Sequence, residues 1–194
     1  MKRFVTLVVC AALVSCFSPH TVTPRHFLLT SVTATDSRPA VNVRLGVRVR
    51  MSEYLLGNSI AVRDSANEIR YLDSVLWAER LDKGFERVLA ADLSAMIPTS
   101  QVRLGAWRTD DVTLEVHVSV EQFDVDRAGK GNLVAGWRIT SPGGRKMLDN
   151  GTARLTRSGK SDPQNTVTTM SELTAEFSRT LAQAMKDIPM KGKE

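Results

Sequence analysis

The sequence predicts an α+β fold, with a mainly antiparallel sheet and two amphipathic helices packed on one of its faces. Segments 41–51 and 112–125 alternate apolar and polar residues, which is typical of half-buried strands. Segments 75–97 and 167–188 instead repeat apolar residues at helical spacing. Because the order is strands, helix, antiparallel hairpins and helix, without an internal repeat, we expect a single domain over residues 25–190.

The chain begins with a segment typical of an export signal. Lys2 and Arg3 precede an uncharged, mostly apolar run from Phe4 to Val14. About eleven residues are too few for a permanent transmembrane helix, which needs roughly 20. We therefore interpret residues 1–15 as a secretory signal peptide.

The end of this signal resembles a bacterial lipobox, in which a small residue precedes a cysteine. The matching residues are Leu13, Ser15 and Cys16. A thiol can take a diacylglycerol as a thioether, and a small Ser15 leaves room for a peptidase. The resemblance implies that Cys16 is lipidated, and two or more acyl chains hold a protein stably on a membrane. The alternatives are an ordinary secreted protein in which Cys16 has no role, or a short membrane anchor.

Composition limits what the mature chain can do. Residues 16–24 are short and polar and are expected to tether the domain to the lipid. Cys10 would be removed with the signal and Cys16 would be lipidated. The domain therefore keeps no free thiol and no Cys/His metal site. The net charge of +5 falls to about +3 when Lys2 and Arg3 are lost. No basic and aromatic cluster suggests a nucleic-acid partner, and no cofactor is expected.

The first strands carry a stripe of arginines. Residues 25–29 predict an edge strand. In segment 41–51 the apolar residues share one face, whereas Arg44, Arg48 and Arg50 lie on the other. This basic stripe has two interpretations, a solvated sheet face or a partner-binding surface.

The next elements are a hairpin and a helix. Segments 59–63 and 68–73 predict a short hairpin. The following helix is expected over residues 75–97, with Ser74 as its N-cap and Pro98 as its end.

The alternation in segment 112–125 slips by one residue, because Phe123 follows Val120 as the next large apolar residue. This slip predicts a bulge near Glu121 and Gln122 that turns Phe123 back to the core. A hairpin loop is expected at 126–131, and further strands are expected at 133–139, 146–148 and 151–157.

The sequence contains no recognisable catalytic set. His117 lies on the polar face of its predicted strand, where a solvated side chain is the simpler interpretation. The adjacent Asp110 and Asp111 precede a strand and are typical of a turn. Because no nucleophile, base or metal-binding motif is present, we expect a protein that is not an enzyme.

Several stretches together resemble the ABC-type transport auxiliary lipoproteins of the PqiC/YmbA type. The family's tryptophan motif at the start of its first helix is matched by Trp77 to Leu81, although Arg80 replaces the usual proline. The other matching stretches are residues 25–29, 45–55, and 116–123 with 133–137.

The resemblance implies a non-enzymatic accessory subunit that works beside an MCE-domain protein, a permease and an ATPase. Such machinery moves lipids between the two bacterial membranes. The subunit would face the periplasm and dock the machinery at the outer membrane, and Phe17 after Cys16 favours passage to that membrane. The alternative function is an outer-membrane assembly lipoprotein that binds a β-barrel. Self-association into a homo-oligomer stays open.

Overall fold

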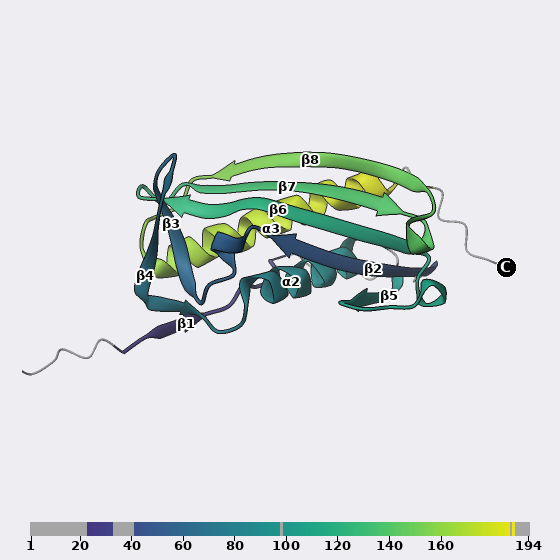
Figure 1. The fold of residues 1–194 in the computed structure, drawn as a ribbon, viewed down its shortest axis with the longest axis horizontal. Coiled ribbons are helices and arrows are strands. Elements are labelled where there is room, and N and C mark those ends of the chain that lie inside the picture. The colour runs from purple at the N-terminus through teal and green to yellow at the C-terminus, as the bar shows by residue number, and fades with distance from the viewer. Residues whose placement is uncertain (1–22, 33–40, 98, 187, 189–194) are drawn as a thin grey trace, which may run out of the picture.

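The computed structural model describes residues 23–32, 41–97, 99–186 and 188. In this part of the chain, one curved eight-stranded sheet is covered on one side by two long helices (Figure 1). The predicted α+β class is therefore confirmed. The strands are β1 (Arg25–Phe27), β2 (Val41–Met51), β3 (Ser59–Ser65), β4 (Glu68–Trp77), β5 (Thr99–Leu104), β6 (Leu114–Asp126), β7 (Gly131–Thr140) and β8 (Met147–Arg157). The helices are α2 (Leu81–Met96) and α3 (Pro163–Lys186), with short 3-10 turns η1 (Glu53–Leu55), η2 (Thr109–Asp111) and η3 (Pro142–Gly144).

Strand β6 organises the sheet. On one side it pairs with β7, which pairs in turn with β8, and both pairings are antiparallel. On its other side, β6 pairs with two strands, one after the other along its length. The first part of β6 pairs with β2, and its end, at Val125 and Asp126, pairs with β3. Beyond these, β5 pairs with β2, while β4 and then β1 continue from β3.

The sheet is mixed rather than purely antiparallel, because parallel pairings join its antiparallel hairpins. Strand β2 runs parallel to both β5 and β6, β3 runs parallel to β6, and β1 runs parallel to β4. A hairpin and helix α2 lie between β2 and its two partners along the chain. Such a long connection returns the chain to the end where β2 began, so the paired strands run in the same direction.

The predicted bulge in β6 is confirmed. The register of β6 against β7 shifts between Val120 and Gln122. Without this extra residue, the alternation would turn Phe123 away from the helices. With it, Phe123 is fully buried, and its ring meets that of Phe85 edge-on at 5.4 Å.

The first helix begins later than the sequence predicts. Residues 75–77 are the end of β4, and α2 begins at Leu81 with Arg80, not Ser74, as its N-cap. The error arises because the spacing of Trp77, Leu81 and Phe85 fits a helix, whereas burial of Val75 and Trp77 fits a strand equally well. Pro98, the expected helix end, lies outside the described residues.

Other boundaries differ less. The expected hairpin is present as β3 and β4, and β8 is one continuous strand over the two segments expected near 146–157. Strand β5 was not predicted, because its short edge sequence has no clear alternation. Among the described residues, no helix is long and apolar enough to cross a membrane.

Within the residues that the structure describes, the helices leave one face of the sheet uncovered. Helix α2 packs on β2 and β5, and α3 packs on β6, β7 and β8 (Figure 1). The core lies between these layers and includes Phe85, Phe123 and Phe177. Because side chains alternate along a strand, every second residue of β2, β6 and β7 points away from the helices. These outward residues form what we call the open face.

Candidate partner-binding surface

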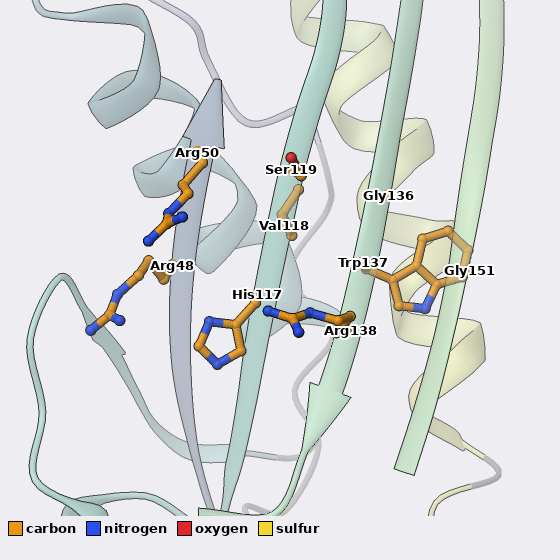
Figure 2. Close-up of a pocket in the computed structure, with 9 residues that line it drawn as sticks. All are labelled: Arg48, Arg50, His117, Val118, Ser119, Gly136, Trp137, Arg138 and Gly151. Atoms are coloured by element: carbon orange, nitrogen blue, oxygen red, sulfur yellow. The ribbon is translucent and has the colours of Figure 1, made fainter. Parts of the chain in front are cut away.

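A hollow of about 420 Å³ lies on the open face, where strands β2, β6, β7 and β8 run side by side (Figure 2). We call it the basic groove. None of its lining residues carries a carboxylate. They are Arg48, Arg50, His117, Val118, Ser119, Gly136, Trp137, Arg138 and Gly151.

The strand register places three basic side chains of the groove in one row. Arg48 of β2 is opposite His117 of β6, and His117 is opposite Arg138 of β7. Neighbouring strands lie about 4.8 Å apart, so the row crosses the sheet in two short steps. The next row along the strands contains Arg50, Ser119 and Gly136 (Figure 2). The sheet therefore gathers basic groups from three segments of the chain.

Arg48 is held in place by neutral groups. Its Nε and Nη2 donate to the carbonyl oxygen of Gly105, at 3.3 and 3.0 Å. Its guanidinium also lies 4.8 Å from the ring centre of Trp107, a cation–π contact. These contacts orient Arg48 without neutralising its charge.

Trp107 reaches this position because β2 has a glycine beneath it. A β-carbon at Gly46 would lie 2.5 Å from Cε2 of Trp107, so only glycine leaves room for the indole. The indole Nε1 then donates to Glu115 at 3.1 Å, which fixes the ring beside the groove. The Trp107 ring centre lies 6.3 Å from that of His117.

Glu115 is the acidic neighbour of the groove, and its own side chain is well bonded. Besides Trp107, the backbone N–H of Gly143 donates to it at 2.8 Å, and Nε2 of His117 lies 3.3 Å from its other oxygen. Burial on its own would raise the pKa of Glu115. The hydrogen bonds from Gly143, Trp107 and His117 outweigh this effect and hold the pKa below its ordinary value of 4.5. Glu115 therefore stays ionised to lower pH.

The predicted arginine stripe separates into two parts. Arg48 and Arg50 are exposed and line the groove. Arg44 is half-buried, and its Nε and Nη2 donate to the carbonyl oxygens of Asp111 and Asp110. Arg44 thus fastens the η2 turn rather than lining the groove. The same contacts place Asp110 and Asp111 in a turn, as the sequence predicts.

Two groove residues were not among the sequence candidates for partner binding. Arg138 lies on the outward side of β7, and alternation with Trp137 and Ile139 could have indicated this. His117, expected to be solvated, is partly buried, with 26% of its side chain exposed, and it lies between Arg48 and Arg138. The sequence could not show that these strands are neighbours.

Three further points concern other candidate sites. Cys16, the predicted lipidation site, lies outside the described residues. Within the described part of the chain, no group of His, Cys, Asp and Glu side chains could hold a metal ion. A second hollow, of about 400 Å³, lies at the β6 bulge and has both Arg63 and the carboxylate of Glu121 in its lining.

These features define an α+β domain whose sheet has one helix-covered face and one open, basic face. A family model described as ABC-type transport auxiliary lipoprotein component matches residues 27–182. The chain belongs to this family, and the resemblance inferred from the sequence is confirmed. The family describes an auxiliary part of an ABC transport system that is a lipoprotein.

Solved structures share the fold. One, an uncharacterized protein, has 21% sequence identity and a TM-score of 0.69, covering 84% of this chain and 98% of its own. A Xanthomonas campestris protein of the DUF330 family has 13% identity and a TM-score of 0.69, covering 84% and 94%. At such identities the likeness concerns the fold alone. No curated protein sequence matches this chain significantly.

Proposed function

We propose that this protein is a non-enzymatic lipoprotein subunit that docks an MCE-type intermembrane lipid transport system at the outer membrane. Membership of the auxiliary lipoprotein family supports a role beside an ABC transporter. We further propose that its partners are an MCE-domain protein with the associated permease and ATPase. The membrane to which it is anchored is proposed to be the outer membrane. Lipidated Cys16 would supply the membrane affinity.

The observation that carries the proposal is the open face itself. Sheets whose second face is uncovered usually present polar, solvated residues there. Here the same face holds a groove in which Arg48, Arg50 and Arg138 lie together without a carboxylate in the lining. Arginine and tryptophan are enriched at protein interfaces, and Trp107 packs beside Arg48. We therefore assign docking to the basic groove.

The test is site-specific photo-crosslinking in cells. A photoreactive amino acid replaces Ser119, an exposed residue in the middle of the groove, in the tagged full-length protein. The matched control carries the same amino acid at Gln183, an exposed position of α3 on the helix side. We expect the Ser119 position, but not Gln183, to crosslink to the MCE-domain protein.

The other outcomes reject the proposal. Crosslinking of the Ser119 position to a β-barrel protein would favour the assembly lipoprotein. Recovery of no transporter component from either position would remove the docking role.

A further inference from the structure

The three arginines of the basic groove form no ion pair within the described part of the chain. Six arginines elsewhere form ion pairs: Arg63, Arg70, Arg80, Arg87, Arg127 and Arg157. In the groove, Arg48 contacts a carbonyl oxygen and an indole ring. Among the described residues, the side chains of Arg50 and Arg138 have no hydrogen-bond or ion-pair partner. The groove therefore holds three guanidinium groups whose charge no ion pair within the described part of the chain neutralises.

The groove also has space that the fold does not require. Gly136 lies on the open face opposite Ser119, and its backbone is not in the left-handed region. A β-carbon there would meet its nearest neighbours, Gly151 O and Thr152 Oγ1, at 3.6 and 3.8 Å, which are ordinary contacts. Glycine inside a strand weakens it and often marks a close approach by another group. At Gly136 this space is open to an incoming ligand.

The spacing of the basic groups indicates an extended ligand. Arg48 and Arg50 are two residues apart on β2, so their α-carbons lie roughly 6.7 Å apart. Side chains at positions i and i+2 of an extended peptide have the same spacing. Arg138 adds a third guanidinium from two strands away, across His117. A single phosphate headgroup would meet one or two of these groups, whereas alternate carboxylates of a peptide lying along β2 would meet Arg48 and Arg50, and the Arg138 side chain extends from β7 toward them (Figure 2).

We propose that the basic groove binds an extended acidic peptide segment whose Asp or Glu residues alternate with uncharged ones. Guanidinium groups form charge-assisted, often bidentate hydrogen bonds with carboxylates. Arg48 is already oriented by Gly105 and Trp107, so binding loses less side-chain freedom there. The identification of this segment as part of the transporter rests on the proposed function; the ligand chemistry does not.

The test measures binding of a labelled peptide to the purified full-length lipoprotein in neutral detergent by fluorescence anisotropy. The probe is a nine-residue peptide in which Glu alternates with Thr, and its control has Gln in place of every Glu. We expect only the acidic peptide to bind. Arg138→Gln and Arg50→Gln should each weaken it about tenfold, since each removes a hydrogen bond to a charged group. Arg179→Gln, the same change at an exposed residue of α3, should leave binding unaltered.

A second variant tests the space in the groove independently of its positive charge. Gly136→Val fills the groove but removes no basic group, and a β-branched residue suits a strand. We expect it to abolish peptide binding while the melting temperature stays the same or rises. Unchanged binding by both Arg138→Gln and Gly136→Val would overturn the assignment.

Two outcomes define the ligand and its link to the transporter. Displacement of the peptide by glycerol phosphate at equal concentration would assign the groove to a lipid headgroup and overturn the peptide proposal. Peptide binding uses no transporter component, so it can succeed where crosslinking from Ser119 recovers none. That combination would reject the transporter role and support the groove's ligand chemistry.

Discussion

Arg63 donates hydrogen bonds from Nε and Nη2 to the same oxygen of Asp124, at 2.9 and 2.6 Å, and the Asp124 side chain has no exposure to solvent. The other carboxylate oxygen accepts from Gln122, and Tyr54 donates to the first. This cluster joins β3 and η1 to the part of β6 beyond the bulge. It therefore fastens the part of the sheet formed by β3, β4 and β1 to strand β6.

Removing the charge of Asp124 should destabilise the fold. In Asp124→Asn the buried side of Arg63 loses its counter-ion, and breaking a buried pair from one side costs up to about 3–5 kcal/mol. Because Arg63 is 24% exposed, we expect a smaller loss in the free energy of unfolding, about 2–3 kcal/mol, measured by urea denaturation. Glu121→Gln, an exposed neighbour in β6, should change it by less than about 0.5 kcal/mol. Equal effects of the two changes would contradict the structural role of the pair.

Tyr54 should make stability depend on alkaline pH. Burial, the negative charge of Asp124 and the hydrogen bond to Asp124 raise the pKa of the Tyr54 phenol from 10.0 to about 12. Because the folded-state pKa is the higher one, the stabilisation is complete below pH 10 and is lost as pH rises through about 12. Tyr54→Phe should remove this part of the alkaline destabilisation.

The ionisation of Tyr54 can be measured directly. The chain has two tyrosines, so Tyr71→Phe leaves Tyr54 as the single phenol. Its tyrosinate absorbance should develop well above pH 10 in the folded protein and near pH 10 in urea. Ionisation at the same pH in both states would disprove the coupling to Asp124.

Gly46 should be intolerant of any side chain. In Gly46→Ala the new β-carbon would overlap the indole of Trp107, which must move away from Arg48 and Glu115. We expect a loss of about 1–3 kcal/mol in unfolding free energy and a change in tryptophan fluorescence. Gly57→Ala serves as the control, because nothing lies within 4 Å of its β-carbon position. An unaltered emission spectrum for Gly46→Ala would show that the indole does not occupy this site in solution.

Cys16 should determine where the protein resides. Cys16→Ser cannot form the thioether, so the domain should fold but leave the membrane fraction. Cys10→Ser is the matched control, since residue 10 lies in the segment expected to be removed. Fractionation with mass spectrometry of the mature N-terminus measures both results. Retention of Cys16→Ser in membranes would refute lipid anchoring at this residue.

Local patterns were sufficient for much of this fold. The strict alternation in segment 41–51 predicted β2 with its observed bounds, and the phase slip before Phe123 predicted the bulge. The pattern around Trp77 was ambiguous. Trp77, Leu81 and Phe85 are four residues apart, which fits a helix, although Trp77 is the last residue of strand β4. Strand β5 is short and lies at an edge, where burial imposes little periodicity.

The sequence by itself determined the face on which each strand residue lies, including the outward positions of Arg48 and Arg50, because alternation is a local property of the extended chain. Only the tertiary structure decided that β2 runs parallel to β6 and that β7 lies on the far side of β6. These pairings join residues distant in the chain, and they depend on how helix α2 returns the chain across the sheet. They bring His117 and Arg138 beside Arg48, and thereby turn a stripe of arginines into a groove.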